Sequence, residues 1–173
     1  MNFLIGIVLV VGLASVLGCR DPSTVTNMAI NAAQGEYTLG VVCGHVANYY
    51  CDCSGLVSYA WGLPAPAIVT QNMQTNYCAK LGNYNELMPG DAILKPDQHV
   101  EMFIRWQVKG STFIEAGCHN TAEGCSHREV PLSNYVGNGY FGCRPHAAYV
   151  CGGSYAMLNG TANSLNETAN SLN

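Results

Sequence analysis

Nine cysteines in a chain of 173 residues constrain this protein more than any other feature of its sequence. Such a density is unusual in a reducing compartment, whereas secreted proteins use cysteines to form disulfide bonds. Nine is an odd number, so if one thiol stays free, the other eight can form four bridges. Three pairs are near enough in sequence to close short loops: Cys43/Cys51, Cys118/Cys125 and Cys143/Cys151. Spacing alone does not fix the connectivity.

An apolar N-terminal run favours the same oxidising compartment. Residues 1–18 carry no charged side chain, and the residues that end the run suit signal-peptide cleavage, so we interpret the run as a signal peptide. The run is also just long enough to span a bilayer, which leaves a membrane anchor open. The sequence Val-Leu-Gly-Cys at 16–19 resembles a lipobox, which would make Cys19 a lipidation site.

The rest of the composition suits one globular domain. Half of the residues are apolar, the net charge is −4, and the seven Lys and Arg are scattered, so the chain lacks the basic surface of a nucleic-acid binder. We predict a domain over residues 19–150 and a flexible polar tail over residues 151–173. In this tail Thr-Ala-Asn-Ser-Leu-Asn occurs twice, and glycosylation sequons begin at Asn159 and Asn166.

The order of predicted elements indicates an α+β fold with an antiparallel sheet, because helices come first and strands follow. Asp21 and Pro22 favour the start of a first helix, and Gly35 favours its end. A second helix is predicted over residues 53–61. Residues 36–50 and 64–86 are predicted to be irregular.

Strands are predicted at residues 92–94, 99–106 and 139–143, with a hairpin that joins 99–106 to a strand ending at 116. Period-two alternation divides the hairpin residues between two faces. The core face has Val100, Met102, Ile104, Trp106, Ile114 and Ala116, and the other face has His99, Glu101, Phe103, Arg105, Phe113 and Glu115.

Metal coordination by the cysteines is not favoured. Cys51 and Cys53 are one residue apart, and Cys43 and Cys125 each have a histidine two positions on. Paired ligands of structural zinc sites usually have two to four residues between them, and export favours disulfides. We therefore predict no metal site.

Cys53 is better explained as a nucleophile. A cysteine in the first turn of a helix meets the positive end of the helix dipole, which favours the thiolate. Such a thiolate needs a base, usually histidine, and a group that orients the base. His99 lies on the face opposite the apolar stripe, and Glu115 on the neighbouring strand can orient it. Competing orienting residues are His119, Asn120 and His127.

Five motifs resemble those of NlpC/P60 cysteine peptidases, which belong to the papain-like superfamily, and they occur in that family's order over about residues 22–146. They are GEYTLG (35–40), DCSGLV (52–57), LMPGDAIL (87–94), HVEMFI (99–104) and YFGCRPH (140–146). The resemblance implies a papain-like fold in which N-terminal helices, including the nucleophile helix, pack on a central antiparallel sheet.

The resemblance also implies roles for individual residues. Cys53 would be the nucleophile, His99 the general base and acid, and Glu115 the third residue, where the family usually has His, Asn or Gln. Residues implied to line the cleft and hold substrate are Tyr37, Asp52 and Ser54. No metal or organic cofactor is implied. Glu101 departs from the family pattern, which has glycine there, and the many cysteines are also unusual.

We therefore expect a secreted, monomeric cysteine endopeptidase whose partner is bacterial peptidoglycan or its stem peptides. The bond implied by the family joins D-γ-glutamate to the diamino acid. Two alternatives stay open: an N-acetylmuramoyl-L-alanine amidase, and a catalytically dead, disulfide-rich binding protein on the same fold. Surface-anchored, periplasmic and phagosomal or lysosomal locations also stay open. We expect no nucleic-acid partner, and no membrane contact beyond an N-terminal anchor.

Overall fold

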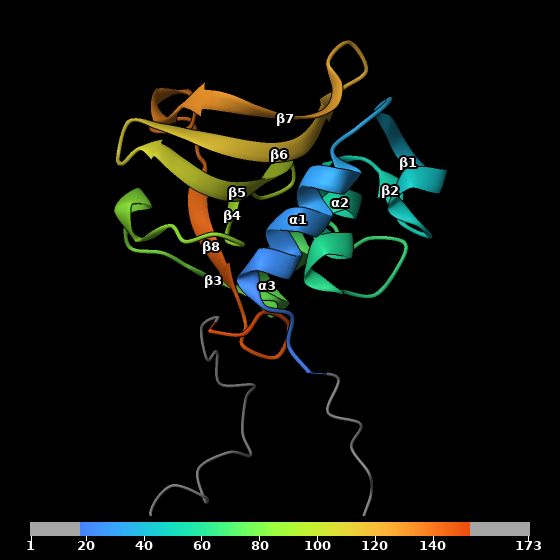
Figure 1. Ribbon diagram of the computed structural model, residues 1–173, viewed down its shortest axis with the longest axis horizontal. Coiled ribbons are helices and arrows are strands. Elements are labelled where there is room, and N and C mark those ends of the chain that lie inside the picture. Colours follow the sequence, from blue (N-terminus) through green and yellow to red (C-terminus); the bar gives the residue numbers. More distant parts are fainter. Residues whose placement is uncertain (1–17, 153–173) are drawn as a thin grey trace, which may run out of the picture.

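The computed structural model describes residues 18–152, which form an α+β fold (Figure 1). Its helices are α1 (Pro22–Ala32), α2 (Cys53–Trp61) and α3 (Thr70–Asn76). The main sheet contains β3 (Cys78–Lys80), β4 (Ala92–Lys95), β5 (His99–Val108), β6 (Thr112–Asn120), β7 (Gly124–Pro131) and β8 (Phe141–Pro145). The spatial order is β3-β8-β4-β5-β6-β7, and all neighbours are antiparallel.

Both predicted helix starts are confirmed, and each depends on an aspartate. Asp21 accepts a hydrogen bond from Thr24 N at 2.9 Å and precedes Pro22, the first residue of α1. Asp52 caps α2 in the same way, through Gly55 N at 2.8 Å. Gly62 ends α2 with a φ of 74°, a conformation that glycine adopts without strain.

The sheet buries both of its faces. Val100, Met102 and Ala116 belong to a core shared with α1 and α2, which cover one face in Figure 1. Phe103 and Phe113 belong to a second core on the other face, together with side chains from the connecting segments. The predicted division of the strands between two faces is thus confirmed for these residues.

The prediction for Trp106 was wrong. The pairing of β5 with β6 shifts between Phe103 and Arg105, where Ile104 is the additional residue. Such a bulge reverses the alternation beyond it. Trp106 therefore packs against the second core, where its ring centroid lies 5.2 Å from that of Phe103.

Two segments predicted to be irregular contain regular elements. Residues 36–50 include β1 (Thr38–Val42), which pairs with β2 (Tyr50–Cys51), and every residue of β1 is exposed. Residues 64–86 contain α3 and β3. The strand β7 was also not predicted, although it pairs with β6 along its whole length. These elements have little apolar periodicity, so the signal that predicts secondary structure is weak in them.

Four disulfides form within the described residues, and Cys53 is the cysteine left free. The pairs Cys43–Cys51 and Cys118–Cys125 are those expected. The pairing of Cys143 with Cys151 was wrong, because these cysteines bond to Cys78 and Cys19 respectively. A disulfide at Cys19 uses the sulfur that lipidation would need. The four bridges are consistent with an oxidising, extracellular environment.

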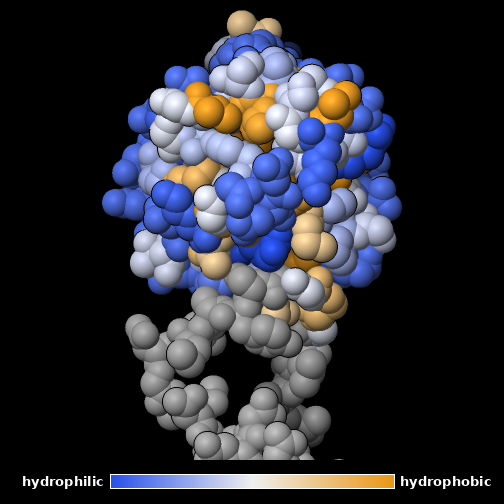
Figure 2. Space-filling model, turned by 90° about the vertical axis from the view of Figure 1, so that its left-hand side faces the viewer, coloured by the Kyte–Doolittle hydropathy of each residue, from blue (hydrophilic) through white to orange (hydrophobic). Residues whose placement is uncertain are grey.

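The chain ends of the described part lie side by side at one pole of the domain (Figure 1). Arg20 forms a bridge with Val150, next to the Cys19–Cys151 bond. Nearly all of the predicted signal peptide, most of the predicted tail and both sequons lie outside the described residues. Between residues 18 and 152, no helix has the length and apolar character needed to cross a membrane. On the face seen in Figure 2, hydrophilic side chains predominate and apolar ones form small separate groups.

Candidate active site

Cys53 is the first residue of α2, and its position depends on a close approach between backbones. A Cβ atom added at Gly55 would lie 2.1 Å from the carbonyl oxygen of Tyr50, so only glycine lets this turn of α2 pack against β2. Cys53 is 7% exposed. The first N–H groups of a helix have no acceptor within it, so the thiol lies at a positively polarised helix end.

Asp52 holds this helix end to the hairpin formed by β1 and β2. Its carboxylate accepts from Gly55 N and Ser54 Oγ, both at 2.8 Å, and from Gly40 N at 3.0 Å. The predicted substrate residues Asp52 and Ser54 thus bond to each other. Burial raises the pKa of Tyr37, and the negative charges of Cys53 and Asp52 raise it further, so the third predicted substrate residue lies close to both.

His99 begins β5 and contacts Cys53. Its Nε2 hydrogen bonds to Glu101 Oε1, which leaves Nδ1 for the hydrogen bond with Cys53. Burial by itself lowers the pKa of His99, but the hydrogen bonds and negative charges of Cys53 and Glu101 outweigh burial and raise the pKa to about 10. The arrangement therefore favours the imidazolium form of His99.

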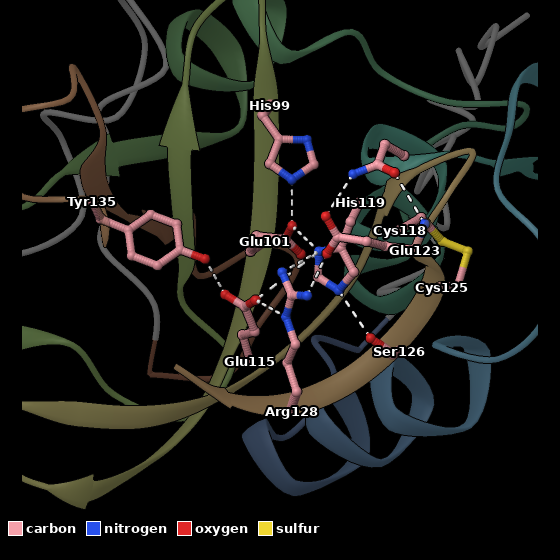
Figure 3. Close-up of polar contacts among 11 residues, drawn as sticks. His99, Glu101, Glu115, Cys118, His119, Glu123, Cys125, Ser126, Arg128 and Tyr135 are labelled. Carbon is pink, nitrogen blue, oxygen red and sulfur yellow. Dashed lines mark hydrogen bonds and ion pairs between the residues drawn. A yellow bond between two sulfur atoms is a disulfide. The ribbon is translucent and has the colours of Figure 1, made fainter. Parts of the chain in front are cut away.

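Glu101 lies between two imidazole rings, as Figure 3 shows. Its Oε1 accepts hydrogen bonds from His99 Nε2 and, at 2.8 Å, from His119 Nδ1. The side chain is 1% exposed. Burial raises the pKa of Glu101, but the bonds and charges of the two histidines dominate and lower it below its usual value. Glu101 is thus a buried carboxylate held in its charged form.

Glu115, the predicted orienting residue, has other partners. It lies opposite Phe103 in the β5–β6 pairing, and Phe103 is four positions along the strand from His99, a distance of about 13 Å. Its carboxylate accepts from Arg128 Nε at 3.0 Å and from the Tyr135 hydroxyl. Burial raises the pKa of Glu115, and the nearby charge of Glu101 adds to the effect. The contact with His99 that we expected of Glu115 is made by Glu101.

The space for the Glu101 carboxylate comes from Gly117 on β6. A Cβ atom at residue 117 would lie 1.3 Å from Glu101 Oε2. The family pattern has glycine at position 101. This chain has Glu101 there, and its glycine is Gly117 on the adjacent strand, which faces Glu101. The side chain at 101 fills the volume that a side chain at 117 would need.

A second layer supports the two histidines. His119 Nε2 lies 3.0 Å from Ser126 Oγ on β7. Arg128 bonds to Glu115 and Glu123, and its Nη2 lies 3.3 Å from His119 Nδ1. A cavity of about 330 Å³ opens here, with His99, Glu101 and His119 in its lining. His99 thus contacts Cys53 and also borders this cavity.

The other predicted orienting residues have different surroundings. His127 is exposed on β7, opposite Ala116. Asn120 is also exposed and bonds to Glu123 through Nδ2 at 2.8 Å. Of the three competitors, only His119 joins the group around His99.

The cysteines considered from sequence as metal ligands cannot bind a metal as thiolates while they are oxidised. Cys43 is bonded to Cys51, and Cys118 to Cys125. A different group does come together. His99, Glu101 and His119 each offer one ligand atom, and these atoms lie within 4.8 Å of one another.

Sequence reasoning missed the role of Glu101 and gave His119 only as one competitor. Alternation along the predicted hairpin could have found Glu101, whereas His119 needed the strand register that the structure supplies. Alternation puts Glu101 on the face of His99, and continuing the pairing of Met102 with Ala116 brings Glu101 opposite Gly117 and His99 opposite His119.

Comparison of the chain with protein-family models, with curated proteins and with solved structures found no match.

Proposed function

We propose that this protein is a secreted cysteine endopeptidase that hydrolyses the stem peptides of bacterial peptidoglycan. The observation that carries the proposal is the pairing of Cys53 with His99. Cys53 is the free cysteine beside eight that form disulfides, it starts a helix, and it shares a hydrogen bond with the half-buried His99. A nucleophile, a base and a buried carboxylate that orients the base are the parts that thiol-based acyl transfer requires.

In the proposed reaction, the Cys53 thiolate attacks the carbonyl carbon of the scissile amide. The backbone N–H of Cys53, at the N-terminus of α2, is positioned to donate to the developing oxyanion. His99 then gives its proton to the leaving amine, and a thioester to Cys53 remains. Water attacks this thioester while His99 takes one of its protons, and Cys53 leaves as the thiolate, which restores the starting state.

Glu101 takes the third role in this mechanism. Its carboxylate fixes the imidazole of His99 and stabilises its charged form. His119, bonded to the same oxygen, holds the carboxylate in turn. The papain-like fold assignment and the choice of the D-γ-glutamyl–diamino acid bond rest on the resemblance of the five motifs. The α+β architecture, with α2 against an antiparallel sheet, is compatible with them.

Digestion of purified peptidoglycan by the wild type and by Cys53→Ala tests the function. Mass spectrometry of the fragments should reveal new amino groups on the diamino acid with the wild type only. New L-Ala termini would support the amidase alternative instead. Equal digestion by the two proteins would exclude Cys53 as the nucleophile.

A second measurement separates an enzyme from a dead binding protein. Native protein treated with iodoacetamide should be alkylated at Cys53, and the modified protein should no longer digest peptidoglycan. Recovery of Cys53 in a disulfide would contradict the mechanism.

A further inference from the structure

We propose that His99, Glu101 and His119 form an inhibitory Zn²⁺ site, which includes the histidine of the proposed catalytic pair. The three ligand atoms lie within 4.8 Å of one another, and two imidazoles with one carboxylate form a donor set that zinc accepts. Three protein ligands leave the fourth position of tetrahedral zinc to water. The inhibitory role, though not the site, rests on the proposed peptidase function.

The carboxylate of Glu101, at the centre of this group, has one oxygen atom that could still accept a bond. Glu101 Oε1 is shared by two histidines, while Oε2 is buried and finds no hydrogen-bond partner among residues 18–152. A buried carboxylate oxygen without a partner is costly. A bound cation beside this carboxylate would offset part of that cost.

A cation can reach the group from solvent, since all three residues line the cavity of about 330 Å³. The carboxylates of Glu101, Glu115 and Glu123 lie close to the group, and the guanidinium of Arg128 is bonded to two of them, Glu115 and Glu123. Zinc binds neutral imidazole, so binding would release the protons that His99 and His119 carry in their charged forms. Imidazole ligands select zinc over Mg²⁺ and Ca²⁺, which prefer oxygen.

Occupancy would block the proposed chemistry without touching Cys53. Zinc would take the ring nitrogen of His99 that now bonds to Glu101 and would remove the carboxylate from its orienting contact. His99 could then no longer accept and return a proton as the reaction needs. Zn²⁺ would therefore act as a reversible inhibitor of the proposed peptidase.

The test is a Zn²⁺ titration of untagged, chelator-treated full-length protein, in competition with a chromophoric chelator and without substrate. The wild type and Cys53→Ala should bind one equivalent. Glu101→Gln and His119→Ala should bind more than about 100-fold more weakly, beyond the usual cost of losing an outer-shell partner. The exposed His127→Ala is the matched control and should bind like the wild type, and Mg²⁺ should not compete. Circular dichroism establishes that each variant is folded, and His119→Gln replaces His119→Ala if the latter is not.

The same metal-free protein is then assayed on peptidoglycan with and without one equivalent of Zn²⁺. Binding with loss of hydrolysis that a chelator restores supports the proposal. Absence of binding, or equal binding by Glu101→Gln and His119→Ala, overturns the site. Binding with undiminished hydrolysis overturns the inhibitory role. If metal-free wild type does not hydrolyse peptidoglycan, the proposed function fails and the inhibitory role with it, while the titration still decides the site.

Discussion

At the scale of single residues, the assignment that matters most is the carboxylate that orients His99. Glu101 and Glu115 are both buried glutamates on adjacent strands, so they form a natural pair for comparison. Glu101 bonds to both histidines, whereas Glu115 bonds to Arg128 and Tyr135. Similar burial with different partners predicts different consequences for the same substitution.

We expect Glu101→Gln to lower kcat on the order of 100-fold, because the amide no longer stabilises the charged imidazole during proton transfer. Glu115→Gln should leave kcat near the wild-type value and cost about 1–3 kcal/mol of stability through its bonds to Arg128 and Tyr135. Steady-state kinetics and urea unfolding measure the two effects. An equal loss of kcat in both variants would contradict the assignment of Glu101.

Gly117 offers an independent test of the same carboxylate. In Gly117→Ala the new methyl group would lie 1.3 Å from Glu101 Oε2, so the carboxylate must leave its place between the histidines. We expect a loss of kcat like that of Glu101→Gln and a loss of stability of about 1–3 kcal/mol, the cost of an unpaired buried group. In Gly44→Ala, the control, the added Cβ meets no atom within 4 Å. Normal kcat in Gly117→Ala would refute the steric argument.

At the scale of elements, α2 and the β1–β2 hairpin act as one unit through Asp52. One carboxylate caps the helix that carries Cys53 and also binds Gly40 N of the hairpin. The hairpin has no buried residue in β1. The bond from Asp52 holds β1 beside the helix, and the Cys43–Cys51 disulfide joins the chain just after β1 to β2.

Asp52→Ala should lower stability by about 0.5–2 kcal/mol, the range observed for removal of an N-cap, and should also reduce hydrolysis because Cys53 follows the cap. Asp52→Asn, which retains a capping oxygen, should lose less on both measures. Urea midpoints at constant m value report the stability change. As a control, Asp21→Ala removes the cap of α1 and should lower the thermal midpoint without affecting hydrolysis.

At the scale of the whole molecule, one disulfide joins two segments that are far apart in sequence. Cys19 and Cys151 are 132 residues apart in sequence, and they join the segment before α1 to the segment after β8. A bridge across a long loop restricts the unfolded chain more than a bridge across a short one. The Cys43–Cys51 bridge, with a separation of 8, provides the comparison.

We expect the double variant Cys19→Ser/Cys151→Ser to lose about 2.5 kcal/mol more stability than Cys43→Ser/Cys51→Ser, the difference in loop-closure entropy between these separations. Chemical unfolding under non-reducing conditions measures both. A smaller loss for the long loop would show that native contacts, rather than chain entropy, dominate the effect. Neither variant removes a residue of the proposed mechanism.

The sequence by itself determined the helix starts, the two faces of the central hairpin and the identity of the free cysteine. Aspartate caps set the starts of α1 and α2, apolar alternation set the two faces of the central hairpin, and an odd cysteine count with a helix-start motif indicated Cys53 as the free thiol. The caps and the alternation depend on residues a few positions apart, and the cysteine count is a property of composition, so the sequence alone specifies these features.

Only the tertiary structure decided which groups meet across long separations. The bulge at Ile104 turned Trp106 to the second core, and the pairing of β5 with β6 brought His119 to Glu101 and kept Glu115 away from His99. The partners of Cys143 and Cys151 were likewise decided by strand order and chain closure. Strand register is a property of two paired segments, and one segment read alone does not contain it.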